Sequence, residues 1–270
     1  MRILILGASG YIGNIIKQSL ANMYEVYGTY RTGGKRDDSS MYLYEVGNEE
    51  LLRDILVEVD PDIVISCLRG DFGKQLKAHE FVAKYLQEKN KGQMIFLSSA
   101  NVFDGDLEQP HFEDDIPEAE SEYGKYKIEC EKILQSILGS RVIIIRIPEV
   151  WGRNCPRIKR LHCCIKEKIE MDTYENLYVN YTTDRQISEW ILYIMKHELK
   201  GIFHVGTEDM YEYIKFQREL IKQFNLKEPI FKINREEEKS YFVVLSERDE
   251  IPKEMRLRVK DIIKYLEVLG

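Results

Sequence analysis

Three side chains in the sequence have the types and the spacing of a proton-transfer site. Tyr123 and Lys127 stand four residues apart at the start of a helical pattern, so both are expected on one face of that helix. A phenol has an ordinary pKa of about 10, and a nearby ammonium group is expected to lower the pKa of Tyr123 toward the working pH. Ser99 ends an apolar run upstream, and its hydroxyl could bind a substrate oxygen. The three residues predict proton donation to a carbonyl.

The segment around Tyr123 has a competing interpretation as a solvated helix face. Tyr126, Lys125 and Lys132 lie close to the Tyr123–Lys127 pair, and this spacing of tyrosine and lysine often arises by chance. A glycine-rich turn near the N-terminus, which predicts a bound dinucleotide, favours the catalytic interpretation.

This turn, residues 7–13 (GASGYIG), directly follows the apolar run 2–6 and opens a helical pattern. Gly7 suits a tight turn, Gly10 lacks the Cβ that would block a pyrophosphate, and Gly13 lets the helix lie close to the sheet. Free amide groups at the positive end of the helix would meet the phosphates. The predicted cofactor-binding residues of the turn are Gly7, Ser9, Gly10, Tyr11 and Ile12. A glycine turn without a ligand is the alternative.

The residue type at the end of the second predicted strand indicates which of two nicotinamide cofactors, NAD or NADP, is bound. Arg31 stands at this strand tip with Lys35 and Arg36 close behind, whereas a carboxylate at the tip would hold the ribose hydroxyl of NAD. A guanidinium suits the 2′-phosphate of NADP. We therefore predict that NADP(H) is preferred, while Asp37 and Asp38 leave NAD(H) open and Arg31 has an alternative as a solvated loop cation.

Strands and helices alternate in the first half of the chain, and this alternation positions both motifs. Strands are predicted at residues 2–6, 25–30, 41–46, 62–67, 93–98 and 142–147, and helices at 12–22, 48–58, 74–90 and 123–138. The pattern predicts an α/β fold of the Rossmann type, a doubly wound parallel sheet with ligands at the carboxyl ends of its strands.

A smaller mixed α/β region is predicted to follow and to bind the substrate. We place the boundary near residue 150, with a dinucleotide-binding domain at 1–150 and a substrate-binding region at 151–270 that is partly interleaved with the first. The expected helices are 157–169, 185–198, 211–223 and 257–268, and the expected strands are 177–179, 201–205 and 229–233. The charge run 235–239 is interpreted as a solvated loop.

Composition excludes several classes of partner. The chain has 270 residues, 44% hydrophobic residues and a net charge of −7, so it has no overall basic field for nucleic acid or an anionic membrane. Its apolar runs, such as 142–147, are much shorter than the roughly 20 residues of a membrane span. The N-terminal apolar run is too short for a signal peptide. We expect a cytoplasmic protein with no nucleic-acid or membrane partner.

The five cysteines predict neither disulfides nor a metal site. Their number is odd, and no Cys-x-x-Cys spacing occurs. His162 stands beside Cys163 and Cys164, but adjacent ligands fit a tetrahedral metal site poorly. Reduced thiols in a cytosolic protein are the simpler interpretation.

Taken together, the motifs resemble those of the extended short-chain dehydrogenases/reductases, which carry a GxxGxxG turn and a Tyr-x-x-x-Lys pair. Within this group, residues 97–105 (LSSANVFDG) are similar to the segment STDYVFDG of dTDP-4-dehydrorhamnose reductases. Residues 123–131 (YGKYKIECE) are similar to their YGxxKxxGE, and residues 146–152 and 201–205 also resemble that family. The chain departs from the pattern at residues 66–69 (SCLR), where the family has Asn-Ala-Ala-Ala, and also at Ala100-Asn101 and Cys130.

This resemblance implies roles for individual residues. Tyr123 would be the acid, Lys127 its activator and a ligand of the cofactor ribose, and Ser99 the catalytic hydroxyl. Cys67 and Leu68 would lie along the cofactor. The implied function is an NADP(H)-dependent reduction of a keto group on a nucleotide-linked deoxysugar, in polysaccharide biosynthesis, by a protein that could form a homodimer. Two alternatives are an NAD-dependent sugar-nucleotide epimerase or dehydratase and a non-catalytic NADP-binding regulatory subunit.

Overall fold

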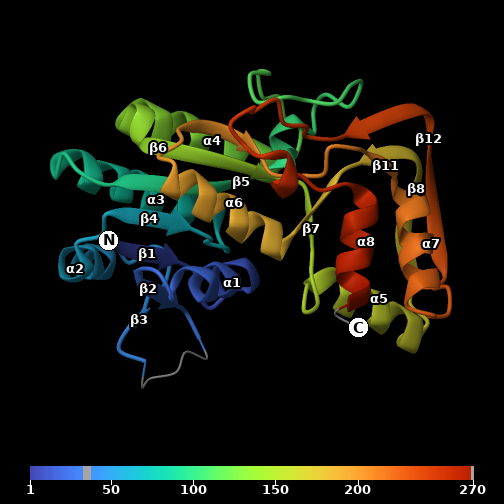
Figure 1. Ribbon diagram of the computed structural model, residues 1–270, viewed down its shortest axis with the longest axis horizontal. Coiled ribbons are helices and arrows are strands. Elements are labelled where there is room, and N and C mark those ends of the chain that lie inside the picture. The colour runs from blue at the N-terminus through green and yellow to red at the C-terminus, as the bar shows by residue number, and fades with distance from the viewer. Residues whose placement is uncertain (33–37, 269–270) are drawn as a thin grey trace.

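A parallel seven-stranded sheet forms the centre of the computed structural model, which describes residues 1–32 and 38–268 (Figure 1). The strand order is β10-β6-β5-β4-β1-β2-β3, and each neighbouring pair is parallel. The strands are β1 (Arg2–Leu6), β2 (Glu25–Tyr30), β3 (Met41–Leu43), β4 (Ile63–Ser66), β5 (Gln93–Ser99), β6 (Val142–Ile147) and β10 (Gly201–His204). The predicted fold class, a doubly wound parallel sheet, is confirmed.

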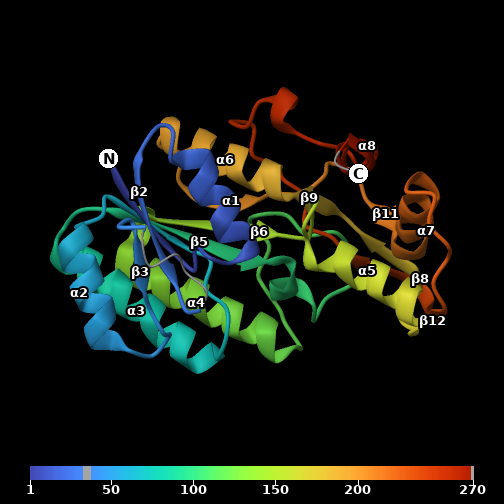
Figure 2. The same ribbon diagram turned by 90° about the horizontal axis from the view of Figure 1, so that it is seen from below.

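Helices cover both faces of this sheet (Figure 2). On one face lie α1 (Tyr11–Leu20) and α6 (Asp184–Lys196), and on the other lie α2 (Glu49–Val59), α3 (Phe72–Glu88) and α4 (Glu122–Leu138). Alternate residues of β1 point to opposite faces of the sheet. Ile3 and Ile5 pack in the hydrophobic core between the sheet and the helices α1 and α6, whereas Leu4 and Leu6 pack in the core on the other face. This two-sided burial explains the nearly continuous apolar strands of the sequence.

Polar side chains cap the helices α2 and α3 at their first residues. Asn48 accepts a hydrogen bond from the amide of Leu51 at the start of α2, and Asp71 accepts one from the amide of Lys74 at the start of α3. α6 and β10 both follow residue 150 in the sequence and nevertheless pack into the central layers.

The remaining elements form a smaller unit beside the carboxyl edge of the sheet (Figure 1). A three-stranded sheet has the order β11-β8-β12, and a two-stranded sheet pairs β7 with β9. The strands are β7 (Glu149–Trp151), β8 (Met171–Val179), β9 (Tyr181–Thr183), β11 (Tyr211–Glu212) and β12 (Phe231–Phe242). The helices are α5 (Pro156–Glu167), α7 (Tyr213–Gln223) and α8 (Val259–Val268), and the short 3-10 helices of the chain are η1 (Ala100–Phe103), η2 (Gly139–Arg141) and η3 (Lys253–Met255).

The prediction of a loop at residues 235–239 is wrong. The run lies within β12, which pairs in parallel with β8 and shifts its register between Arg235 and Ser240. β12 is an edge strand, so its side chains can reach water while the backbone pairs, and Arg235 forms an ion pair with Glu175. The charges indicated solvent exposure correctly and chain conformation incorrectly. Among the helices that the structure describes, none is both long and apolar enough to cross a membrane.

Candidate active site

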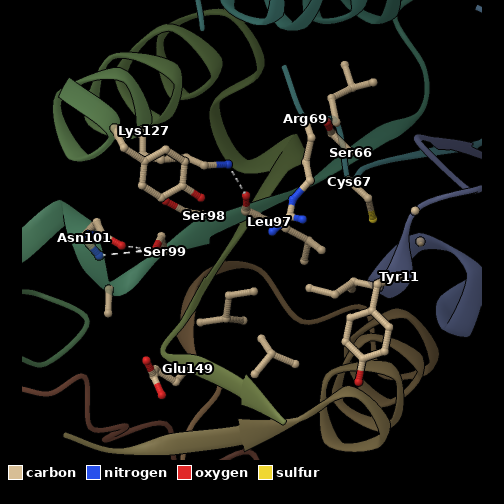
Figure 3. Close-up of a pocket in the computed structure, with 18 of the residues that line it drawn as sticks. Tyr11, Ser66, Cys67, Arg69, Leu97, Ser98, Ser99, Asn101, Lys127 and Glu149 are labelled. Carbon is tan, nitrogen blue, oxygen red and sulfur yellow. Dashed lines mark hydrogen bonds between the residues drawn. The ribbon is translucent and has the colours of Figure 1, made fainter. Parts of the chain in front are cut away.

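A pocket of about 660 Å³ lies at the carboxyl edge of the central sheet (Figure 3). It brings together most of the residues that the sequence singled out. The predicted residues in its walls are Gly10, Tyr11, Ile12, Cys67, Leu68, Ser99, Tyr123 and Lys127. Gly7, Ser9 and Arg31 are described by the structure but do not line this pocket.

The start of α4 is fixed against η1, and this positions Tyr123 and Lys127. Ser121 caps the helix by accepting a hydrogen bond of 3.0 Å from the amide of Gly124, and the carboxylate of Asp104 accepts one of 3.1 Å from the amide of Ser121. A Cβ on Gly124 would lie 2.1 Å from the carbonyl oxygen of Asn101, so only glycine permits this close approach. The loop after β5 and the helix therefore hold a single relative position.

Lys127 is buried, and its amine donates a hydrogen bond of 2.7 Å to the carbonyl oxygen of Leu97 (Figure 3). The amine also lies 4.5 Å from the centre of the Phe96 ring. Burial lowers the pKa of Lys127 from 10.5 to about 8, because a charged amine is poorly solvated there. At neutral pH the side chain is still largely protonated, and it can exchange a proton near that pH.

The predicted lowering of the Tyr123 pKa by Lys127 is wrong. Burial raises this pKa above 10, partly offset by a hydrogen bond with Ser99 and by the charge of Arg69. The amine of Lys127 lies 5.6 Å from the centre of the Tyr123 ring and is directed to a backbone carbonyl. Although the Tyr123 side chain is 37% exposed, desolvation is the largest effect on its pKa, and the phenol stays protonated at neutral pH.

Ser99 lies at the end of β5, where its hydroxyl is held by η1. The hydroxyl donates a hydrogen bond of 2.9 Å to Oδ1 of Asn101 and accepts one of 3.3 Å from the amide of the same residue (Figure 3). It also interacts with the Tyr123 hydroxyl. The two hydroxyls can thus approach one carbonyl oxygen together.

A buried ion pair between Glu131 and Arg146 lies next to Ser98, which lines the pocket. The carboxylate of Glu131 binds the guanidinium of Arg146 at 2.8 Å and accepts a hydrogen bond of 2.5 Å from the hydroxyl of Ser98. Both charged side chains are nearly inaccessible to solvent. Since Ser98 precedes Ser99 on β5, this pairing fixes the strand end that carries the candidate catalytic hydroxyl.

The glycine turn has the shape that a dinucleotide requires. Gly7 adopts a φ of +82°, and a Cβ there would lie 2.7 Å from the carbonyl oxygen of Cys67. A Cβ on Gly13 would lie 2.4 Å from the carbonyl oxygen of Gly7, so helix and turn are in close contact. At Gly10 the nearest atom would be 3.2 Å away, and Gly10 lines the pocket. No side chain caps α1 within the described chain, which leaves its first amides free for phosphate oxygens.

Tyr11, the residue after Gly10, is held by a carboxylate of the second half of the chain. Its hydroxyl donates a hydrogen bond of 2.5 Å to Asp184, which also accepts one of 2.8 Å from the hydroxyl of Tyr265 on α8. Burial and the neighbouring carboxylate both raise the pKa of Tyr11, so it remains a neutral donor. This contact ties the glycine turn to α6 and α8.

Arg31 follows β2 and is exposed to solvent. Lys35, Arg36 and Asp37 lie outside the described residues. Asp38 forms an ion pair of 3.0 Å with Lys17, and hydrogen bonds from Ser40 and Lys17 lower its pKa to about 2. Because this carboxylate already has partners, it is a weaker candidate for binding a ribose hydroxyl than the sequence suggested.

Sequence reasoning missed several charged and aromatic groups in the pocket walls. Arg69 and Phe72 follow β4, and the side chain of Arg69 points into the pocket in Figure 3. The position of Arg69 after a predicted strand end could have revealed it, since ligands gather at that edge. Glu149 and Arg157 also line the pocket, but no local pattern marks them.

The comparisons with known proteins agree with this fold. The parallel sheet, the glycine turn and the Tyr-x-x-x-Lys pair are the features on which the resemblance to the extended short-chain dehydrogenases/reductases was based. The chain belongs to the RmlD substrate binding domain family, whose model matches residues 71–250.

Individual proteins are similar over most of the chain. Methionine adenosyltransferase 2 subunit beta of Bos taurus is 26% identical over 239 residues, which cover 78% of this chain and 69% of that protein. The structure of a Bacillus anthracis dTDP-4-dehydrorhamnose reductase in complex with NADP has a TM-score of 0.79 and 17% identity, over 100% of this chain and 99% of that one. Thermus thermophilus UDP-glucose 4-epimerase with NAD has a TM-score of 0.79 and 18% identity, over 97% and 99%. At these identities the two structures establish a shared fold.

Proposed function

We propose that the protein is an NADP(H)-dependent reductase of a keto group on a nucleotide-linked deoxysugar. The observation that carries the proposal is one pocket lined by both the glycine turn at Gly10 and the trio Ser99, Tyr123 and Lys127. Family membership and the fold shared with an NADP-bound dTDP-4-dehydrorhamnose reductase support this choice of substrate and cofactor. In this proposal the residues up to about 150 bind the cofactor, and the later ones shape the substrate end.

The pocket fits a dinucleotide. Gly10 leaves room for a pyrophosphate beside the free amides of α1, and Tyr11, Ile12, Cys67 and Leu68 provide the wall along which the rest would lie. Arg31 would bind the 2′-phosphate of NADP. The nicotinamide, when bound, supplies the hydride that is added to the carbonyl carbon.

Tyr123 supplies the proton that balances this reduction. Its raised pKa keeps the phenol protonated at neutral pH, so it can donate to the carbonyl oxygen as negative charge develops there. The hydroxyl of Ser99, which donates to Oδ1 of Asn101 in the free protein, turns to donate a second hydrogen bond to the same substrate oxygen. The charge of Arg69, which lowers the pKa of Tyr123, stabilises the phenolate that remains. Lys127, with a pKa of about 8, helps to return the proton to the phenolate. The carbonyl carbon gains the hydride, its oxygen gains the proton, and an alcohol results.

Oxidation of NADPH by purified protein tests this function directly. A panel of nucleotide-linked 4-keto sugars is added, and loss of NADPH absorbance is followed, with Tyr123→Phe as the inactive control. We expect oxidation with at least one sugar. Protein that contains NAD and interconverts sugars without net cofactor use would instead be an epimerase.

A second candidate function is a regulatory subunit that binds NADP without catalysis. The similarity to methionine adenosyltransferase 2 subunit beta favours this alternative, because the name of that relative describes a subunit of another enzyme. The complete trio of Ser99, Tyr123 and Lys127 argues against it. Protein that binds NADPH and oxidises none with any sugar of the panel would support the regulatory function.

A further inference from the structure

Arg69 places a cation without a protein partner in the wall of the pocket. Four charged side chains of the described chain line this pocket, and three of them are bound to other protein groups. Lys127 donates a hydrogen bond to Leu97, and Arg157 forms an ion pair of 3.1 Å with Glu149. Within the described residues Arg69 makes no hydrogen bond or ion pair, and it is exposed to solvent. Its guanidinium therefore offers all of its N–H donors to a ligand.

The backbone on both sides of Arg69 is fixed, so the side chain starts from a defined position. Before it, the amide of Cys67 donates a hydrogen bond of 2.8 Å to the carbonyl oxygen of Leu6 on β1. After it, the carbonyl oxygen of Gly70 accepts one of 2.8 Å from the side-chain amide of Gln75, which is buried on α3. Gly70 has a φ of +128°, a conformation that favours glycine. From this turn the side chain of Arg69 extends into the pocket (Figure 3).

The location of Arg69 indicates which kind of ligand it would bind. In the view of Figure 3 its guanidinium lies between Lys127 and Tyr11, that is, between the proposed reaction site and the glycine turn. Its charge also acts on the phenol of Tyr123. A dinucleotide that reaches from Gly10 to Tyr123 has its phosphate groups along this path, and a nucleotide-linked sugar also carries a diphosphate. Phosphate oxygens accept paired hydrogen bonds from the planar guanidinium of arginine.

We propose that Arg69 binds a phosphate group of a nucleotide in the pocket. The inference rests on the proposed function. The phosphate belongs either to the cofactor or to the diphosphate of the nucleotide-linked sugar, and both present the same chemistry to a guanidinium. Because a guanidinium has five N–H donors and stays charged when it is paired, Arg69 can hold a phosphate and still act on the phenol of Tyr123.

A solvated cation that acts only on Tyr123 is the competing explanation. Arg69 would then stabilise the phenolate and contact water, so its replacement would change kcat and leave every ligand affinity unaltered. Binding measurements separate the two explanations without any turnover.

Calorimetric titration of Arg69 variants tests the inference. Arg69→Gln removes the charge and keeps a hydrogen-bond donor, whereas Arg69→Lys keeps the charge and loses the planar fork. Lys74→Ala is the matched control, because Lys74 is an exposed cation on α3 that does not line the pocket. The probes are NADPH added to the free protein, and dTDP and UDP added to protein saturated with NADP⁺. Melting temperatures show whether each variant is folded.

We expect Arg69→Gln to weaken the binding of at least one of these ligands by about 10- to 100-fold. Arg69→Lys should weaken it less, and Lys74→Ala should leave all affinities unchanged. A loss confined to NADPH assigns the bound phosphate to the cofactor, and a loss confined to dTDP and UDP assigns it to the sugar nucleotide.

Unchanged affinities for NADPH, dTDP and UDP in a folded Arg69→Gln protein would overturn the inference, as would a wild-type protein that binds none of the three. Failure of the proposed function is a separate result. If NADPH is oxidised with no keto sugar, the proposed reduction fails, and the affinities still decide whether Arg69 binds a phosphate.

Discussion

The amine of Lys127 donates a hydrogen bond of 2.7 Å to the carbonyl oxygen of Leu97, on the strand that leads to Ser99. This bond anchors the cation on the sheet, 5.6 Å from the centre of the Tyr123 ring. Ser99 and Arg69, and not Lys127, are the groups that lower the pKa of that phenol, against the larger effect of burial. The site thus combines a protonated phenol with a buried amine whose pKa is near neutrality.

Replacing Tyr123 by phenylalanine should abolish turnover and leave cofactor binding intact. The ring and its contact with Phe72 remain, and only the donated proton is lost. General acid catalysis contributes about 10²- to 10⁴-fold, so kcat should fall by at least about 100-fold. Fluorescence titration with NADPH and steady-state kinetics measure the two quantities. Tyr126→Phe, on the same helix, serves as the control, and retained turnover in Tyr123→Phe would remove this residue from the mechanism.

Replacing Lys127 by methionine should stabilise the fold at pH 7. Burial lowers the pKa of the amine from 10.5 to about 8, which corresponds to about 3 kcal/mol lost from the free energy of unfolding when the amine is charged. The lost hydrogen bond to Leu97 offsets about 1 kcal/mol of this gain. We expect a net stabilisation of about 1–3 kcal/mol, together with loss of activity.

The pH dependence of this stabilisation has a defined sign. Below pH 8 the amine is charged in both the folded and the unfolded state, so the penalty is complete. Between pH 8 and 10.5 the unfolded chain binds more protons than the folded one, so wild-type stability rises with pH relative to Lys127→Met. Denaturant unfolding of both proteins at pH 7 and pH 9.5 should therefore give a smaller difference at the higher pH. An equal difference at the two values would contradict the assigned pKa.

Two alanine substitutions in the glycine turn should have different effects. At Gly10 a Cβ meets its nearest atom at 3.2 Å, so Gly10→Ala should cost about 1 kcal/mol of stability or less. At Gly13 a Cβ would lie 2.4 Å from the carbonyl oxygen of Gly7, so Gly13→Ala should cost about 1–3 kcal/mol.

Cofactor binding then identifies the role of Gly10. Its Cβ would occupy the space proposed for the pyrophosphate, so Gly10→Ala should weaken NADPH binding by at least about 10-fold while remaining folded. Melting temperature and calorimetry give both quantities on the same samples. Unchanged affinity in a stable Gly10→Ala protein would place the cofactor elsewhere.

Replacing Arg31 by alanine should weaken NADPH binding far more than NADH binding. Loss of one charge-assisted hydrogen bond to a phosphate should lower the affinity for NADPH by about 10- to 100-fold. Arg53→Ala, an exposed arginine on α2, is the control for a general loss of positive charge. If both cofactors lose affinity equally, Arg31 does not bind the 2′-phosphate.

The central strands could be predicted because each of them consists of a short run of apolar residues, as expected for a strand that is buried on both faces. The run 142–147 is β6 with the predicted bounds, and the turn at residues 7–13 opens α1 as expected. Strand order could not be predicted, because pairings such as β1 with β4 join residues distant in sequence. The run 235–239 was misassigned because an exposed edge strand and a loop both carry charges.

The motif residues could be expected near one another from the sequence, whereas isolated residues of the pocket could not. Ser99, Tyr123 and Lys127 were found through strand ends and helical spacing, and the structure brings them into one pocket. Glu149 and Arg157 meet only through tertiary packing, and no spacing in the sequence relates them to the trio. The direction of the Tyr123 pKa shift was wrong for a similar reason, since desolvation depends on neighbours such as Phe72 from another helix.

Transfer of deuterium from labelled NADPH tests the central claim most directly. NADPH deuterated at the hydride-donating carbon is incubated with the protein and a nucleotide-linked keto sugar, and the product is analysed by mass spectrometry and NMR. A single deuterium on the new carbinol carbon, absent with Tyr123→Phe, is the predicted result. A product whose carbinol hydrogen comes from solvent, or NADPH that stays bound and unoxidised while Ser99, Tyr123 and Lys127 are intact, would contradict reduction at this site.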